Sequence, residues 1–255
     1  MLTFVVLLLL ILIIIPALVV IPQTFTSLNY FTFPIPKFSF KWVERFFENQ
    51  EWVIGLGRSL FIALVVALLA TALGTMAAVA INKLEFKGKG LFMGLMISPM
   101  VIPVVIIGIA LYNTFAKIGL TNTCLGLILS HTLIALPMVF TTMLSGFAGV
   151  NENLELAAMS MGSTAVGAFF KVTLPTVKSS FVASILFAFV SSLDEVAVTL
   201  FVSGANTKTL PIVMWERMNT YADPTLAVAA TFLIVLTLGT YIVKEIMEVR
   251  AARKG

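Results

Sequence analysis

Long apolar segments alternate with short polar connections along most of the chain. A helix that crosses a bilayer needs about 20 mainly apolar residues, and six segments reach that length. The pattern therefore predicts an all-α membrane protein with six transmembrane helices in a single transmembrane domain, residues 1–255. The expected spans are residues 2–21, 56–81, 91–113, 124–148, 181–202 and 226–243.

Prolines interrupt several of these apolar segments. They stand at Pro16, Pro99, Pro103 and Pro137. Membrane helices tolerate proline because neighbouring helices satisfy the carbonyl groups that it leaves free. We expect the helices to continue through these positions with a kink near each proline.

The connection between the fourth and fifth apolar segments, residues 150–178, is polar and contains several glycines. Its first part has the helical spacing of apolar residues, at Leu154, Ala157, Ala158 and Met161. Gly162 is expected to end this helix, and Ser163 to cap a second helix that ends at Leu174-Pro175. The small alanines allow another protein to approach closely. The alternative is that both helices rest against their own bundle.

Composition sharpens the membrane assignment. Of the 255 residues, 60% are hydrophobic and 11% are charged, whereas about 25% are charged in soluble domains. The single Cys124 excludes an internal disulfide and a multi-cysteine metal site. A net charge of +4 spread over connections has no dense basic tract, so we expect no nucleic-acid binding. The sequence has no GxxxxGK[ST] loop to hold nucleotide phosphates.

The basic residues indicate an orientation in the membrane. Six spans place both termini on one side, and nine of the 16 lysines and arginines fall on that side. Three of the nine, Lys83, Lys87 and Lys89, share one short connection. Because cytoplasmic connections are enriched in basic residues, we expect both termini to be cytoplasmic.

The opposite side carries the aromatic residues that favour membrane interfaces. Its connections contain all three tryptophans, Trp42, Trp52 and Trp215. Residues 41–52 place three apolar side chains on one helical face, Val43, Phe46 and Phe47. This pattern predicts a short helix lying on the outer surface, with a docking site for a partner as the alternative.

The loop at residues 150–178 carries a motif of a known family. The pattern AAxxxG begins at Ala157, the dipeptide LP begins twelve positions after the glycine, and the loop precedes the second-last span. This arrangement resembles the EAA loop of membrane subunits of binding-protein-dependent ABC importers. Leu156 stands where the motif has its glutamate, and Glu155 comes one residue earlier. The resemblance implies ATPase coupling through Glu155, Ala157, Ala158, Gly162, Leu174 and Pro175.

The resemblance also implies the partners of the chain. In this family the loop forms coupling helices that enter a groove of the ATP-binding subunits, which form a dimer and hold ATP and Mg²⁺. The chain itself is then expected to be a permease with no cofactor and no enzymatic activity. Further implied partners are a second, non-identical permease subunit, an extracytoplasmic substrate-binding protein and the lipid of a bacterial inner membrane.

Other segments resemble one branch of this family. Residues 174–204 and 207–218, together with His131 and Pro137 in the fourth span, are similar to permeases for spermidine and putrescine. The resemblance covers about residues 56–245 and implies a polyamine substrate. Another small solute, such as an aminophosphonate, an opine or a different amine, remains the alternative.

Two carboxylates lie inside the fifth expected span. A carboxylate at the centre of a membrane helix costs about 2.5 to 3.5 kcal/mol, so Asp194 and Glu195 are expected to face protein or a path rather than lipid. They either help a cationic substrate to pass or form structural hydrogen bonds, with Ser191, Ser192 or the partner subunit as candidates. The residues considered for the substrate path are Asp194, Glu195, His131, Trp215 and Glu216.

His131 is the only histidine, and no carboxylate lies near it in the sequence. We therefore expect packing with one hydrogen bond rather than a metal site or a proton relay. A secondary transporter would need internal repeats and broken helices, and no duplication is visible. An intramembrane enzyme would need a nucleophile with a base or paired metal ligands, and a lone histidine gives little support for that class.

Overall fold

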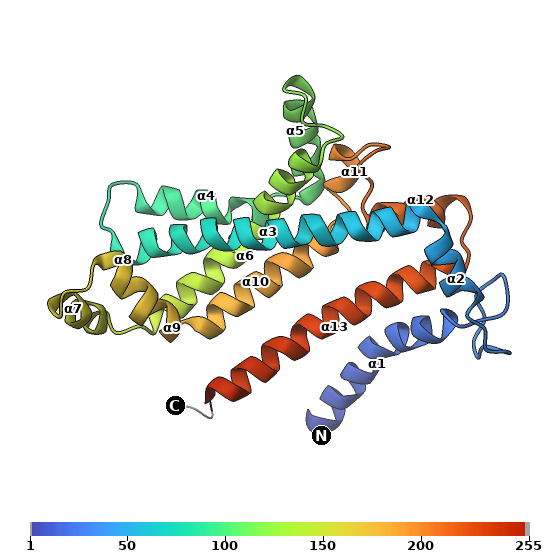
Figure 1. Ribbon diagram of the computed structural model, residues 1–255, viewed down its shortest axis with the longest axis horizontal. Helices are drawn as coiled ribbons and strands as arrows, with labels where there is room; N and C mark the ends of the chain where they lie inside the picture. The colour runs from blue at the N-terminus through green and yellow to red at the C-terminus, as the bar shows by residue number, and fades with distance from the viewer. Residues whose placement is uncertain (1, 253–255) are drawn as a thin grey trace. The chain divides into compact units, whose positions relative to one another are not determined.

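The computed structural model describes the backbone of residues 2–252, which is helical almost throughout (Figure 1). The prediction of an all-α membrane protein is confirmed, because long apolar helices make up most of the described chain. The helices are α1 Leu2–Gln23, α2 Lys41–Glu48, α3 Gln50–Lys83, α4 Lys89–Val101, α5 Val104–Lys117, α6 Cys124–Ala148, α7 Glu152–Ser160, α8 Ala165–Ala168, the π-helix η1 Phe169–Thr173, α9 Leu174–Thr176, α10 Lys178–Leu193, α11 Thr199–Val202, α12 Leu210–Thr220 and α13 Thr225–Ala252.

Within the described residues, three helices are long and apolar enough to cross a membrane unbroken. They are α3, α6 and the part of α13 from Thr225 to Ile246. Two bent pairs of helices meet the same length and hydropathy requirement, α4 with α5 and Ala165–Thr176 with α10, so up to five spans follow from length and composition. At the first expected span, the stretch Ile14–Gln23 is a shorter apolar helix.

The chain divides into two compact units. The first contains Met1–Ser59 and Thr207–Gly239, and the second contains Leu60–Asn206 and Thr240–Gly255. Helices α3 and α13 each contribute to both units.

The core of the first unit is rich in aromatic residues and gathers around α2. Trp42, only 1% exposed, and Phe46 are buried there beside Trp52. The Nε1 of Trp42 donates a hydrogen bond to the backbone oxygen of Leu28 at 2.9 Å. The expected apolar face of α2 was therefore misplaced, because Phe47 is exposed. Residues 42 and 46 lie four positions apart and so share one face of the helix.

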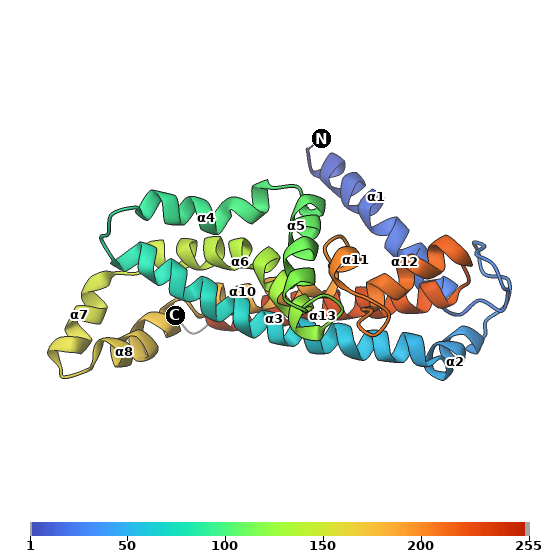
Figure 2. The same cartoon turned by 90° about the horizontal axis from the view of Figure 1, so that it is seen from above.

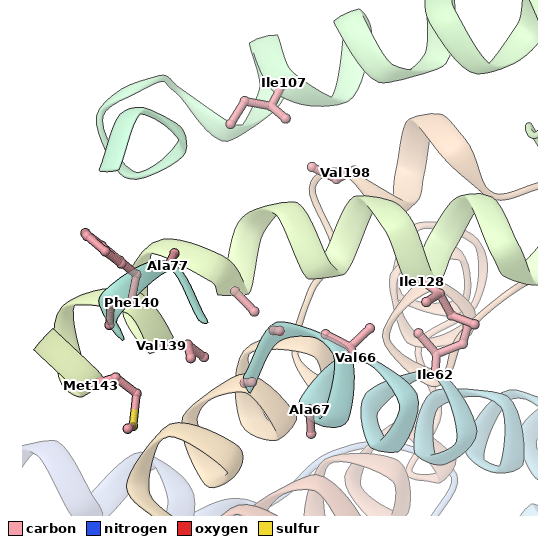
Figure 3. Close-up of a cluster of buried hydrophobic side chains, with 14 of the residues drawn as sticks. Ile62, Val66, Ala67, Ala77, Ile107, Ile128, Val139, Phe140, Met143 and Val198 are labelled. Atoms are coloured by element: carbon pink, nitrogen blue, oxygen red, sulfur yellow. The ribbon is translucent and has the colours of Figure 1, made fainter. Parts of the chain in front are cut away.

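The core of the second unit lies between α3, α6 and α10. Figure 3 shows Ile62 of α3 beside Ile128 of α6, both of them buried. Helix α10 packs along α6. Figure 2 shows α4 and α5 running in different directions within this unit.

The third expected span, residues 91–113, is broken in the structure. Helix α4 ends at Val101 and α5 begins at Val104, with an angle of 104° between them. Ile102 is extended, with φ −76° and ψ 132°, because the ring of Pro103 disfavours a helical conformation in the preceding residue. A kink was expected near Pro103, and the chain turns there far more sharply than a kink. Pro99 stays inside α4.

The fifth expected span, residues 181–202, is also interrupted. Helix α10 ends at Leu193, and helical structure resumes only in the short α11 at Thr199. The carboxylate of Glu195 accepts a hydrogen bond from the backbone nitrogen of Val198 at 2.8 Å. Asp194 and Glu195 therefore occupy a break in the helix, where free backbone groups are satisfied by a side chain, and not a helix interior.

Close packing of α3 on α6 depends on Gly74. A Cβ atom at this position would lie 2.5 Å from Cγ1 of Val139 and 3.2 Å from the backbone nitrogen of Phe140. We expect Gly74→Ala to lower stability by about 1 to 3 kcal/mol, since overpacking forces neighbours apart. The change should appear as a lower melting temperature in detergent-based thermal unfolding monitored by size-exclusion chromatography.

Two variants control this measurement. Val139→Ala removes the nearest clashing atom, so Gly74→Ala combined with Val139→Ala should regain stability relative to the sum of the single changes. Gly94→Ala should not lower the melting temperature, because nothing lies within 4 Å of a Cβ at that position and alanine favours a helix more than glycine does. Equal effects of Gly74→Ala and Gly94→Ala would contradict the close contact between α3 and α6.

Candidate functional site

The loop at residues 150–178 forms two helical arms joined by a glycine turn. The first arm, α7, is capped by Asn151, whose side chain accepts a hydrogen bond from the backbone nitrogen of Asn153 at 3.0 Å. Gly162 has a φ of +91°, a left-handed conformation that glycine adopts without strain. The second arm is capped by Thr164, which accepts from the backbone nitrogen of Gly167 at 3.1 Å. The expectation that Ser163 caps it was wrong by one residue.

The second arm ends close to its expected end at Leu174-Pro175. It runs through α8, one turn of π-helix and α9 to Thr176, one residue after Pro175. The direction changes after α9, and the angle between Ala165–Thr176 and α10 is 82°. The two arms and α9 gather at one end of the second unit (Figure 1).

The first arm presents apolar side chains outward. Leu156, at the position of the motif glutamate, is 59% exposed, and Met161 in the turn is 83% exposed. Ala157 is also exposed, whereas Ala158 is half-buried. Exposed apolar residues of this kind, outside a span, are typical of a surface that another protein covers.

Glu155 points away from that exposed face and has partners within the chain. Its carboxylate accepts hydrogen bonds from Nζ of Lys83, the last residue of α3, and from the hydroxyl of Thr173, the last residue of η1. Burial raises the pKa of Glu155, but the bonds from Lys83 and Thr173 and the charge of Lys83 outweigh this effect and lower it below its ordinary value. The carboxylate is therefore ionised at neutral pH.

His131 lies in the interior of the second unit, between α6, α10 and α11. It is 1% exposed. Its Nδ1 is 2.8 Å from Oγ of Ser192, and its Nε2 is 2.8 Å from Oγ1 of Thr199. The hydroxyl of Thr199 also donates to the backbone oxygen of Glu195. His131 thus packs as expected, with two hydroxyl partners instead of one, and it joins both sides of the break at residues 194–198.

The remaining candidates for the substrate path occupy two separate places. Asp194 is exposed and Glu195 is half-buried at the break in the second unit. Trp215 and Glu216 belong to α12 in the first unit, where Glu216 pairs with Lys208. In the second unit, Asp194 and Glu195 lie next to the group formed by His131, Ser192 and Thr199. In the first unit, Glu216 belongs to a cluster of charged side chains.

That charge cluster connects the start of α3 with α12. Lys208 pairs with Glu216 and Glu51, and Arg217 pairs with Glu51 at 2.8 Å. The hydrogen bond to Glu216 raises the pKa of Lys208 above its ordinary value; burial opposes this and the bond to Glu51 adds to it. Lys208 is therefore charged at neutral pH. Among the described residues, no three His, Cys, Asp or Glu side chains come together as metal ligands.

Sequence reasoning missed several of these partners. Lys83 and Thr173 were not connected with Glu155, although a lysine at the end of an apolar helix indicates a position near the membrane surface.

The structure also forms a cavity of about 380 Å³ between α6 and α10, lined mostly by hydroxyl groups. Its lining residues are Thr141, Thr142, Ser145, Ser179, Ser180 and Ala183.

Comparison with known proteins identifies the family. Residues 70–253 match the family described as binding-protein-dependent transport system inner membrane component. The spermidine/putrescine transport system permease protein PotC of Haemophilus influenzae is 29% identical over 91% of this chain and 90% of that protein. The putrescine transport system permease protein PotI of Escherichia coli is 28% identical over 85% of this chain and 83% of its own length. A probable molybdenum ABC transporter permease protein of Haloferax volcanii is 30% identical over 75% of this chain and 77% of the relative.

Solved structures show the same fold. A chain of a bacterial ABC transporter for the import of alginate has a TM-score of 0.73 at 12% identity, covering 96% of this chain and 93% of that chain. A chain of an amino acid ABC transporter has a TM-score of 0.60 at 18% identity, with coverage of 82% and 95%. The helical fold, the apolar spans and the family match agree: the chain belongs to the inner-membrane permease subunits of binding-protein-dependent ABC importers.

Proposed function

We propose that this permease forms, with a second and non-identical permease, the translocation path for a polyamine of the spermidine or putrescine type. The observation that carries the substrate class is the similarity to polyamine permeases along most of the chain, 91% of it for the Haemophilus relative. The exposed carboxylate of Asp194, beside Glu195 at the helix break, supports a cationic substrate.

The energy for transport comes from a separate dimer of ATP-binding subunits, which holds ATP and Mg²⁺. The exposed apolar face of α7 and the adjoining glycine turn are the surface that docks on this ATPase. The site residues for docking are Ala157, Ala158, Gly162, Leu174 and Pro175. An extracytoplasmic binding protein delivers the substrate on the opposite side of the membrane.

The loop contacts and the charge distribution support one orientation of the chain in the membrane. Lys83 at the end of α3 pairs with Glu155 in the coupling loop, so the lysine-rich connection at residues 83–89 lies at the same end of the second unit as that loop. A cytoplasmic ATPase and the enrichment of lysine in cytoplasmic connections both require this end to face the cytoplasm. With six spans, both termini are then cytoplasmic.

Uptake into proteoliposomes tests the substrate class. The permease pair, its ATPase and its binding protein are reconstituted, and ATP-dependent uptake of labelled spermidine is compared with uptake of molybdate. We expect spermidine uptake and stimulation of ATP hydrolysis by the spermidine-loaded binding protein. Uptake of molybdate without spermidine would favour the substrate named for the Haloferax relative and would contradict the polyamine proposal. Asp194→Asn should weaken spermidine uptake, whereas Asp223→Asn, in the connection before α13, serves as the matched control.

A further inference from the structure

The contacts of Glu155 join three segments of the second unit. Its carboxylate receives Nζ of Lys83 from the end of α3 and the hydroxyl of Thr173 from the end of η1, while Glu155 itself belongs to α7. One side chain therefore connects a membrane helix with both arms of the coupling loop, on either side of the turn at Gly162. Ser160, in contrast, uses its hydroxyl within α7, on the backbone oxygen of Leu156.

The environment favours a firm contact. The side chain of Glu155 is 16% exposed and that of Lys83 is 28% exposed, so the pair is shielded more than a typical surface ion pair. Thr173 is 1% exposed. The ring of Phe169 lies 5.7 Å from Nζ of Lys83 and adds a cation–π contact. The carboxylate thus has two donors, and one of them, Lys83, is itself held by Phe169, so the carboxylate has a defined position.

The contact between Glu155 and Lys83 borders a cavity. A cavity of about 630 Å³ lies between the last turns of α3 and the second arm of the loop, and Lys83 and Glu155 are among its lining residues. Apolar side chains form most of the wall, with Met76 and Val79 on α3 and Val166 and Phe170 on the second arm. Because an open cavity separates these elements, apolar packing joins them incompletely, and the ion pair connects them directly.

The two neighbouring positions of the motif therefore face in different directions. Leu156, where the family motif has its glutamate, is exposed, while Glu155 is turned toward α3. We propose that Glu155 is a positioning residue that transmits movement of the coupling loop to α3 through Lys83, rather than a contact to the ATPase. This inference rests on the proposed docking of the ATPase at α7.

Charge reversal and charge exchange test the proposal in the assembled complex. The variants are Glu155→Lys, Lys83→Glu and the exchange that combines both, with Glu155→Gln as the conservative change. The ATPase should still co-isolate with every variant, because the exposed face of α7 is unchanged. In each single charge reversal, uptake of labelled spermidine per ATP hydrolysed should fall about tenfold, a typical size for a coupling contact, and the exchange should restore it to within about twofold of the wild type.

Glu85→Lys is the matched control. Glu85 pairs with Lys89 at 3.1 Å, and this pair joins the connection after α3 to the first residue of α4 rather than to the coupling loop. Uptake per ATP should not change in this variant. Hydrogen exchange over residues 152–160 gives a second measurement, since loss of the contact should accelerate exchange in α7 in both charge reversals and in neither the exchange nor the control.

Several results would overturn the proposal. One is unchanged uptake per ATP and unchanged hydrogen exchange in the charge reversals. Another is a charge exchange that stays as impaired as the single variants. If Glu155→Gln no longer co-isolates with the ATPase while the wild type still does, Glu155 would instead belong to the ATPase interface. If the wild type itself fails to bind the ATPase, the proposed docking fails, and hydrogen exchange then decides whether the contact between Glu155 and Lys83 exists.

Discussion

Replacement of Ala157 by tryptophan is expected to abolish ATP-driven uptake. Ala157 is an exposed small residue on α7, and its methyl group allows a partner backbone to come close. An indole ring at this position would hold the two surfaces several ångströms apart, which removes the contacts of a closely packed interface. We expect uptake to fall by about 100-fold or more, because one central steric block can remove about 3 kcal/mol of binding, and we expect the ATPase to be lost from the purified complex.

The chain itself should remain folded in this variant, since an exposed side chain displaces no core residue. Ala116→Trp provides the matched control, because Ala116 is an exposed alanine on α5, which Figure 1 shows well apart from α7. In addition, Ala157→Cys on a Cys124→Ser background should cross-link to the ATPase. Normal uptake by Ala157→Trp, or the absence of any cross-link from residues 152–162, would show that α7 is not the docking surface.

Replacement of His131 by leucine is expected to cause the largest loss of stability. The imidazole forms hydrogen bonds with the hydroxyls of both Ser192 and Thr199. Leucine would leave both hydroxyls without this partner in a buried site. Each hydroxyl that loses its bond costs about 1 to 2 kcal/mol, so the total should be roughly 2 to 4 kcal/mol. The melting temperature in detergent should fall by several degrees, and protease sensitivity should rise near residues 194–198.

Thr132→Val is the control for this experiment. Thr132 is the buried neighbour of His131, but its hydroxyl bonds to the backbone oxygen of Ile128 within α6, so its removal should cost much less. His131→Gln should recover part of the stability because an amide can reach one hydroxyl. Spermidine uptake by the folded His131→Gln protein separates the two roles considered for this residue. An unchanged KM assigns His131 to the structure alone, whereas a raised KM places it on the substrate path.

The sequence was most informative where the relevant physics is local. The length of the apolar segments predicted a membrane protein, because the thickness of the bilayer sets the length of a spanning helix. Gly162 predicted the turn between α7 and α8, since a left-handed backbone favours glycine. The same reasoning failed at Pro103 and Glu195, where hydropathy continues across a break in the helix. Hydropathy reports the affinity of a segment for lipid and does not report backbone geometry.

The same distinction between local features and contacts of distant residues applies to the candidate site. The class of protein and the glycine turn in the loop at residues 150–178 could be predicted from the sequence alone, because these depend on residues a few positions apart. The contact of Glu155 with Lys83, 72 residues away, could be found only in the folded chain. The same holds for the contacts of His131 with Ser192 and Thr199, which are 61 and 68 residues away. Helical periodicity shows which side chains share a face, but the packing of one helix on another determines which distant side chain that face meets.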